Sequence, residues 1–238
     1  MALLIGGAYF NLETNFDSSI PAQFNTDFIS LIGFFFFMIM GNFMTSLSPV
    51  TLVFPRDRQV FLKEESAKLY NTVTFFLSRI LIELPFLILV PLIYALVLYW
   101  MVGLESSAEI FFTFALGMFL ASLAGNSFGL LLGSTSSDPK VVAALNPVLI
   151  IPFVLFSGYF KNREDLPVWL GWVEYISPMK YSFIIFVRNE VHEEDQQGLV
   201  DTLNFDIELW PSVFILIGIC IGSQLIALFF LWLGRSKL

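Results

Sequence analysis

The chain has 238 residues, of which 57% are hydrophobic and 13% are charged, and its formal net charge is −8. Soluble domains carry about 25% charged residues, so this composition excludes an ordinary soluble domain and places the chain in the membrane class. The single cysteine, Cys220, excludes an intrachain disulfide and a zinc site built from cysteines.

The first ten residues, MALLIGGAYF, are apolar but too short to cross a bilayer. They lack a basic n-region and a small-residue cleavage site, so they do not predict a signal peptide. We interpret them as the second half of a transmembrane helix.

Five longer apolar runs follow, each close to the roughly 20 residues that a helix needs to cross about 30 Å of hydrocarbon. The sequence therefore predicts an all-α, polytopic membrane domain over residues 1–238, with about five complete transmembrane helices and a partial first one. The predicted spans lie within Phe28–Phe54, Asn71–Val102, Ile110–Gly133, Val141–Phe160 and Leu209–Gly234.

The loops between these spans differ in their content of Lys and Arg. Loop 55–70 holds four, loop 134–140 holds one and the C-terminus holds two, whereas loops 11–27 and 103–109 hold none. The long loop 161–208 holds four against ten acidic residues. The positive-inside rule therefore predicts that 55–70, 134–140 and the C-terminus face the cytoplasm, and that 161–208 is extracellular or lumenal.

The stretch FPRDRQVFLKEESAKLY carries charges of both signs, so orientation alone does not account for it. Glu64 and Lys68 stand in the i,i+4 order that favours a helix. The pattern predicts a short interfacial helix; the alternative is a solvated loop that only sets orientation. A helical wheel places Val60, Leu62, Ala67, Leu69 and Tyr70 on one half, and Phe61, Glu64, Glu65 and Lys68 on the other.

Polar side chains inside the spans are candidates for function or for helix packing. Arg79 and Glu83 lie one turn apart and indicate an intramembrane ion pair, either structural or functional. Asn42, Thr45 and Ser46 share one helical face and would either join helices or line a cavity.

Small residues and aromatic residues mark two further features. Gly125, Gly129 and Gly133 recur at i,i+4 spacing, which favours a helix-packing face. In the outer loop, Pro167 could begin a short helix and Ser177-Pro178 could end it, which predicts a re-entrant or interfacial helix pair. Four amphipathic rings there suit the membrane interface: Trp169, Trp172, Tyr175 and Tyr181.

Sequence signatures of catalysis are missing from the chain. Neither G-x-x-x-x-G-K-[ST] nor G-x-G-x-x-G occurs, so the chain alone predicts no ATP site and no enzyme activity. The single histidine, His192, lies in an acidic run, and this pattern predicts an exposed residue rather than a metal ligand.

Two passages resemble the membrane domain of the G subfamily of ABC transporters, the white/pleiotropic-drug-resistance type of exporter. The first is D-R-x-x-F-x-x-E, formed by Asp57, Arg58, Phe61 and Glu64 and followed by R-I-L-I-E-L-P at 79–85. The family usually has Glu-Arg at the first two positions. The second passage is F-S-G-Y-F at 156–160, then P-x-W-L-x-W-x-x-Y-x-S-P-x-x-Y at 167–181.

The resemblance implies that segment 55–70 is a coupling element that docks on a nucleotide-binding domain. It implies coupling roles for Asp57, Arg58, Phe61 and Glu64, with ATP and Mg²⁺ bound in that domain and no cofactor on this chain. It further implies a homo- or heterodimer of half-transporters.

The same resemblance places substrate between the Phe28–Phe54 and Val141–Phe160 spans of two subunits. Asn42 and Thr45 fall at its cavity positions, and Ala144 and Leu145 fall where the exit path narrows. The family often has larger residues where this chain has Thr45 and Ala144. Family members have six spans and a preceding nucleotide-binding domain, so we interpret the chain as a fragment, a truncated product or a separately encoded permease.

These observations predict the permease part of an ATP-driven exporter that moves lipid, sterol or amphipathic small molecules, in the plasma membrane by default. The alternatives are a non-transporting truncated subunit or membrane scaffold, and an ATP-independent channel. The channel is less favoured because no ring of charge lies mid-span. Nothing predicts a nucleic-acid partner.

Overall fold

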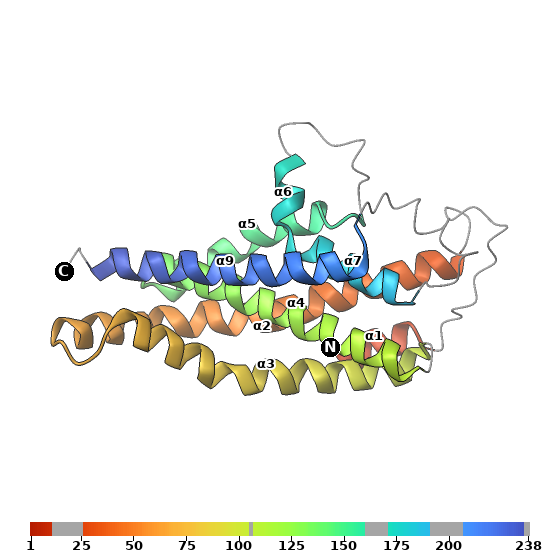
Figure 1. The fold of residues 1–238 in the computed structure, drawn as a ribbon, viewed down its shortest axis with the longest axis horizontal. Helices are drawn as coiled ribbons and strands as arrows, with labels where there is room; N and C mark the ends of the chain where they lie inside the picture. Colours follow the sequence, from red (N-terminus) through yellow and green to blue (C-terminus); the bar gives the residue numbers. More distant parts are fainter. Residues whose placement is uncertain (11–25, 105–106, 160–170, 191–206, 236–238) are drawn as a thin grey trace.

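The computed structural model describes residues 1–10, 26–104, 107–159, 171–190 and 207–235, and within these ranges the chain folds into helices without strands. Four helices, α2, α3, α4 and α9, are long and apolar enough to cross a membrane, which confirms the predicted all-α polytopic class (Figure 1). The helices are α1 (Ala2–Ala8), α2 (Thr26–Ser66), α3 (Thr72–Val102), α4 (Ala108–Thr135), α5 (Pro139–Leu155), α6 (Gly171–Ile176), α7 (Pro178–Glu190) and α9 (Leu209–Arg235).

Helix α2 continues unbroken through the charged segment, with Pro49 and Pro55 inside it. Its 41 residues span about 62 Å at 1.5 Å per residue. The prediction of a separate interfacial helix in 55–70 is therefore wrong. The segment is the end of a membrane helix, which turns at residues 67–71 and returns as α3 to form a helical hairpin (Figure 1).

Helix α5 is shorter than the span predicted over Val141–Phe160. It has 17 residues, or about 26 Å, and ends at Leu155. Gly158 has φ 89°, a left-handed conformation that glycine adopts without strain and that a helix cannot continue through. The bundle thus combines four full-length helices with a shorter apolar one.

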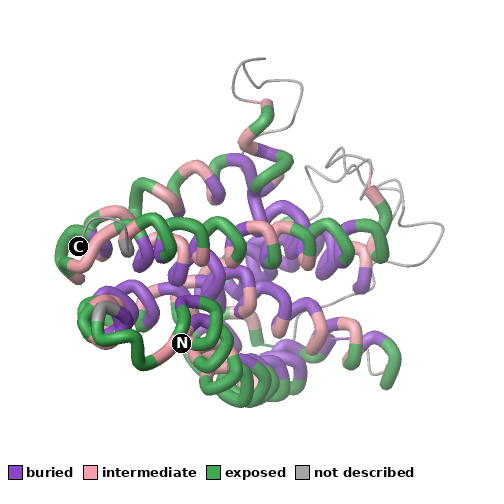
Figure 2. The backbone as a smooth tube through the Cα atoms, turned by 60° about the vertical axis from the view of Figure 1, so that its left-hand side comes forward, coloured by how far each residue is buried: buried purple, intermediate pink, exposed green. Residues whose placement is uncertain are grey.

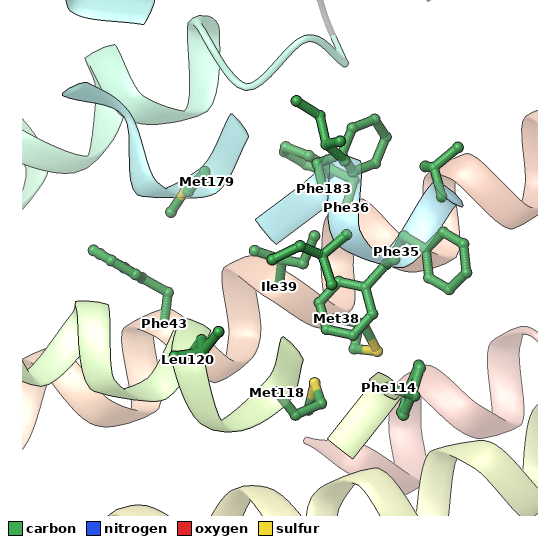
Figure 3. Packing of buried hydrophobic residues seen from close by; sticks show 14 of the residues in the cluster. Phe35, Phe36, Met38, Ile39, Phe43, Phe114, Met118, Leu120, Met179 and Phe183 are labelled. Carbon is green, nitrogen blue, oxygen red and sulfur yellow. The ribbon is translucent and has the colours of Figure 1, made fainter. Parts of the chain in front are cut away.

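The outer helix pair is present as α6 and α7, which meet at Ser177. Twelve of the thirteen residues of α7 are buried, and α7 packs against α4, α9 and α2. This agrees with the predicted re-entrant pair; Pro167 lies outside the described residues. The ring of Phe186 on α7 lies 5.8 Å from that of Phe35 on α2 and 5.1 Å from that of Phe114 on α4, centroid to centroid. Figure 3 shows Phe35 and Phe114 within the buried cluster.

Burial increases from the rim of the bundle to its centre (Figure 2). Helices α3 and α9 expose most of their apolar residues, whereas α4 is surrounded by the other helices. An apolar outer face is the expected solution for a bundle whose solvent is lipid hydrocarbon.

The α2–α4 contact confirms the glycine strip as a packing face. Small residues let two helix backbones approach closely where no hydrophobic effect drives helices together in the bilayer. A Cβ atom would lie 2.5 Å from the carbonyl oxygen of Phe43 at Gly125, 2.9 Å from Cβ of Val50 at Gly129, and 2.8 Å from Cδ1 of Phe54 at Gly133.

Three basic segments lie together at one end of the bundle, which we call the hairpin end (Figure 1). Arg58 in the α2 part of the hairpin bonds to Ser137 in the α4–α5 connection, and its guanidinium also lies against Gly234 at the end of α9. The structure thus brings 55–70, 134–140 and the end of α9 to the same side. The assignment of that side to the cytoplasm stays a prediction.

Replacement of Gly125 by Ala should destabilise the fold by about 1–3 kcal/mol, because the added methyl would collide with the backbone of Phe43, which cannot move aside alone. The measurement is thermal unfolding of the detergent-solubilised protein. Gly222→Ala on α9 is the control, since nothing lies within 4 Å of its Cβ position. Equal stability of the two variants would contradict the packing role of the strip.

Candidate functional site

The end of the α2–α3 hairpin where the chain reverses, residues 54–75, is called the hairpin tip, and it has an aromatic core of its own. The ring of Phe61 stacks on Phe75 of α3 with centroids 4.5 Å apart, and Tyr70 and Phe54 each lie 6.3 Å from Phe75. Phe61 is fully buried. The helical wheel that placed Phe61 on the polar half is therefore wrong, because the returning helix α3 covers that face. Phe61 holds the two limbs of the hairpin together.

Two acidic residues near the tip are held by neighbouring hydroxyls. Tyr70 donates a hydrogen bond to the carboxylate of Glu64, and Thr72 donates to Oε1 of Glu65 over 2.8 Å. Burial, followed by the hydrogen bond to Glu64, raises the pKa of Tyr70 to about 12. Tyr70 therefore stays protonated at physiological pH and remains a donor to Glu64.

Arg58 and Gln59 connect the hairpin to the α4–α5 connection. Arg58 donates to the hydroxyl of Ser137, and Nε2 of Gln59 donates to the carbonyl oxygen of Ser137 over 2.6 Å. The sequence analysis assigned no role to Ser137, since nothing in its local sequence indicates a partner 79 residues away.

A chain of charged and polar groups leads from the hairpin into the bundle. Asp57 of α2 pairs with Arg79 of α3 over 2.8 Å, and Arg79 pairs with Glu83 over 2.5 Å. Asn126 of α4 then donates to Glu83 over 2.8 Å. The sequence indicated the Arg79–Glu83 pair from its i,i+4 spacing, but Asp57 and Asn126 join it only through the tertiary fold.

The four residues expected at a cavity or gate between two subunits differ in their surroundings within one chain, and their role stays a prediction. Asn42 is buried and donates to the carbonyl oxygen of Met118 on α4 over 2.8 Å, so its amide joins two helices. Thr45 is exposed on α2 and bonds within its own helix. On α5, Ala144 is exposed and Leu145 is half-buried.

A polar contact between α2 and α5 lies close to these residues. Nδ2 of Asn146 donates to the hydroxyl of Thr51 over 3.0 Å. Its Oδ1 atom is buried and has no hydrogen-bond partner among the residues that the structure describes. The sequence analysis did not single out this buried acceptor at the contact between the two helices.

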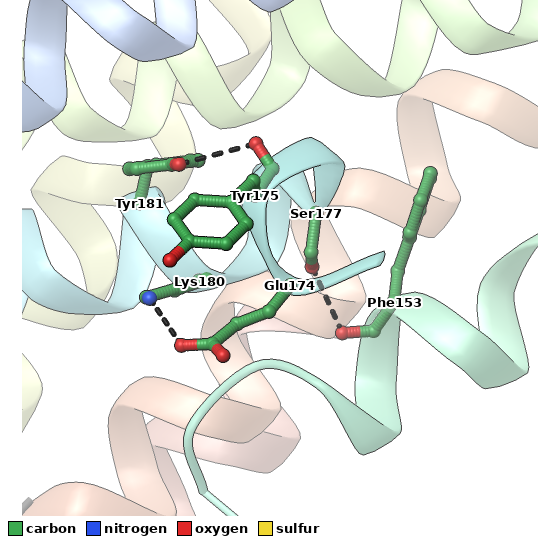
Figure 4. A network of polar contacts seen from close by, with 6 residues as sticks. All are labelled: Phe153, Glu174, Tyr175, Ser177, Lys180 and Tyr181. Carbon is green, nitrogen blue, oxygen red and sulfur yellow. Dashed lines mark hydrogen bonds and ion pairs between the residues drawn. The ribbon is translucent and has the colours of Figure 1, made fainter. Parts of the chain in front are cut away.

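The corner between α6 and α7 contains a buried ion pair (Figure 4). Lys180 pairs with Glu174, and their side chains are only 8% and 11% exposed. The hydroxyl of Tyr181 donates to the carbonyl oxygen of Tyr175 over 3.1 Å, and the Lys180 ammonium lies 5.7 Å from the centre of the Tyr175 ring. The Lys180–Glu174 ion pair and the Tyr181–Tyr175 hydrogen bond each join α6 to α7, so together they fix the angle between the two helices.

A further hydrogen bond fastens this corner to α5. Ser177 donates to the carbonyl oxygen of Phe153 over 3.1 Å (Figure 4). That carbonyl belongs to the last turn of α5, where helical partners run out, since the amide of Ser157 bonds Val154 instead. The α6–α7 corner therefore caps the end of α5.

Comparison with known proteins gives a consistent family assignment. The ABC-2 type transporter family matches residues 1–191. The chain is 31% identical over 258 aligned residues to ABC transporter G family member 1 of Dictyostelium discoideum, which covers 99% of this chain and 31% of that protein. It is 33% identical over 148 residues to Protein white of Drosophila melanogaster, covering 62% of this chain and 21% of that protein.

A mammalian relative agrees with these matches. The chain is 28% identical over 206 residues to the broad substrate specificity ATP-binding cassette transporter ABCG2 of Rattus norvegicus, covering 86% of this chain and 30% of that protein. The chain thus spans less than a third of the length of these relatives. The matches confirm the resemblance to the G subfamily.

Replacement of Arg79 by Met should lower the free energy of unfolding by about 1–3 kcal/mol, because Asp57 and Glu83 would lose the cation between them. Arg56→Met is the control, since Arg56 is exposed on the same limb as Asp57; its effect should stay within about 0.5 kcal/mol. Chemical unfolding in detergent measures both. A smaller loss for Arg79→Met than for Arg56→Met would contradict the network.

Replacement of Lys180 by Met should destabilise the protein by about 3–5 kcal/mol, because it leaves the Glu174 carboxylate buried without its cation. The double variant Lys180→Met/Glu174→Leu should recover part of that loss, since no charge then remains buried. A double-mutant cycle on thermal unfolding gives the coupling between the two side chains. Additive effects of the two single changes would show that the pair does not hold the corner.

Proposed function

The chain belongs to the ABC-2 type transporter family, and we propose that it is the membrane-spanning permease part of an ATP-driven exporter of the G subfamily. It is a multi-pass integral membrane protein, with apolar helices suited to span a bilayer. The observation that carries the proposal is the hairpin tip. It is a braced, charged projection of a membrane helix, and such a projection suits contact with a protein outside the bilayer.

In this proposal ATP and Mg²⁺ bind to a nucleotide-binding domain, either on the same polypeptide or on a separate one. The hairpin end faces the cytoplasm, where that domain would dock on the tip. Closure of the domain on ATP would favour one conformation of the permease through its differential affinity for the two states. The polar chain from Asp57 to Asn126 supports this role, because it connects the hairpin to the central helix α4.

We propose that substrate passes between α2 and α5 of two half-transporters. Helix α5 supports this with an exposed apolar stripe at helical spacing, and Asn146 of the same helix joins it to α2 through the hydroxyl of Thr51. Such a surface suits a lipid, a sterol or an amphipathic small molecule, and the plasma membrane is the default location. The stripe comprises Val141, Ala144, Val148, Ile151 and Leu155.

A membrane scaffold or non-transporting subunit is the second candidate function. It is supported by the close packing of α2 against α4 along Gly125, Gly129 and Gly133, which holds the helices together without a second protein. A scaffold needs the bundle but neither an ATPase partner nor an open α5 stripe. Purification from native membranes separates the two candidates.

The protein purified in mild detergent should carry an ATPase, in the same chain or as a second subunit, and should move a fluorescent phospholipid or sterol analogue across liposomes in an ATP-dependent manner. Ala144→Trp should reduce this movement at least tenfold, because the bulky ring would obstruct the path of substrate along the exposed face of α5. The ATPase should remain bound. Ile82→Trp on the exposed face of α3 is the matched control and should leave transport unchanged. Absence of any ATPase, together with absence of ATP-dependent movement, would favour the scaffold.

A further inference from the structure

The residues that form the D-R-x-x-F-x-x-E motif all have contacts within the chain. Asp57 pairs with Arg79 and Glu64 accepts from Tyr70, while Phe61 is buried against α3. The fourth, Arg58, bonds Ser137. These four residues therefore stabilise the tip through contacts within the chain. Other exposed residues of the tip are the candidates for the surface that contacts a partner.

The outward face of the tip is formed by residues at helical spacing. Arg56, Val60 and Lys63 follow one another at four and three residues, so they share one face of α2, and all three are exposed. Ala67, the first residue after α2, is also exposed. Val60 is 54% exposed, although a β-branched apolar side chain gains nothing from water. The face thus combines an apolar side chain with two cations.

The turn after α2 adds a second apolar residue and another cation. The amide of Lys68 bonds the carbonyl of Glu65 over 2.8 Å, and the amide of Leu69 bonds that of Glu64 over 3.2 Å, which is a Schellman helix end. Lys68 takes the left-handed position with φ 58°, where glycine is usual and a side chain costs roughly 1–2 kcal/mol. Leu69 is 68% exposed beside it.

The length of α2 favours a protein partner over lipid headgroups. A bilayer with its headgroup regions is about 40–45 Å thick, and the 41 residues of α2 reach about 62 Å. The surplus of about 15–20 Å matches the stretch that follows Arg56, the first charge after the apolar part of α2. For an α2 that stands upright in the bilayer, Val60, Lys63, Lys68 and Leu69 therefore lie beyond the headgroup phosphates, with Arg56 at the edge of that region.

We propose that Arg56, Val60, Lys63, Lys68 and Leu69 form the docking face of the tip, and that they fit an apolar pocket rimmed by Asp and Glu on the partner. The inference rests on the proposed function, in which that partner is the nucleotide-binding domain. The exposed apolar side chains of Val60 and Leu69 would be desolvated in that pocket, and the cations would set orientation and association rate. The motif residues act as positioning residues beneath this face.

Photo-crosslinking in the native complex tests the docking face. Cys220 is buried, so a single introduced cysteine can be labelled with a maleimide photo-crosslinker. Probes at Val60→Cys and Leu69→Cys should attach to the ATPase domain, at an apolar segment flanked by Asp or Glu, whether that domain is on the same chain or on another. A probe at Leu77→Cys, which is 52% exposed on the α3 limb, should give at least tenfold lower yield.

Charge variants then test the cations. Lys63→Glu and Lys68→Glu should each lower the crosslink yield from position 69 at least fivefold, and Lys140→Glu, an equal charge change on α5, should not. Lys68→Gly keeps the left-handed turn while removing the charge, so a loss in this variant separates charge from turn geometry. The same experiments are run in nanodiscs of phosphatidylcholine alone and with phosphatidylserine.

The outcomes separate this inference from the proposed function. If no ATPase domain accompanies the wild-type protein, the proposed function fails first. If the domain is present but positions 60 and 69 label it no better than position 77, the docking face is wrong. Lysine effects that occur only with phosphatidylserine, or probes that label lipid alone, would assign the face to the membrane instead and overturn the inference.

Discussion

The close contact between α2 and α4 is the constraint on which the rest of the bundle depends. Lipid tails are as apolar as leucine, so apolar surface alone gives these helices no reason to associate. Gly125, Gly129 and Gly133 remove the side chains that would hold the two backbones apart. The approach then brings the amide of Asn42 to the carbonyl of Met118, which is a bond that only neighbouring backbones can make. Steric fit comes first, and the polar bonds follow from it.

Besides its packing contacts, α4 makes a polar contact with each of α3, α9 and α7. Asn126 bonds Glu83 of α3, Ser127 accepts from Gln224 of α9 over 3.0 Å, and the carbonyl of Ile110 accepts from Asn189 of α7 over 3.0 Å. Each bond has no water to compete with it in the apolar interior, so each favours one register of its helix pair. The hairpin is therefore joined to α4 through the Asp57–Arg79–Glu83–Asn126 contacts, besides the direct contacts of Arg58 with the α4–α5 connection and the end of α9.

The sequence predicted the features that depend on local composition. Apolar length revealed the spans, and i,i+4 spacing revealed both the glycine strip and the Arg79–Glu83 pair. The sequence did not predict which residues are buried where the covering residue comes from a distant part of the chain. The wheel placed Phe61 outward because it could not include Phe75, which covers Phe61 from the returning helix. The sequence did predict a helix in 55–70, but it did not show that this helix is the continuation of α2, whose Phe61 packs against Phe75 of α3.

In the hairpin tip, the residues of the sequence motif differ from the residues that we propose to contact the partner. In D-R-x-x-F-x-x-E the fixed letters Asp57, Phe61 and Glu64 contact other residues of the hairpin, and Arg58 contacts the α4–α5 connection. Val60 and Lys63 are exposed and occupy positions that the motif leaves open. A surface at open positions can change its charge and apolar content without altering the fold beneath it. The residues that build the tip and the residues that would select its partner are thus separate sets on one helix. A partner with a different rim of charge could be accommodated by substitutions at 56, 60 and 63 while Asp57, Arg58, Phe61 and Glu64 stay as they are.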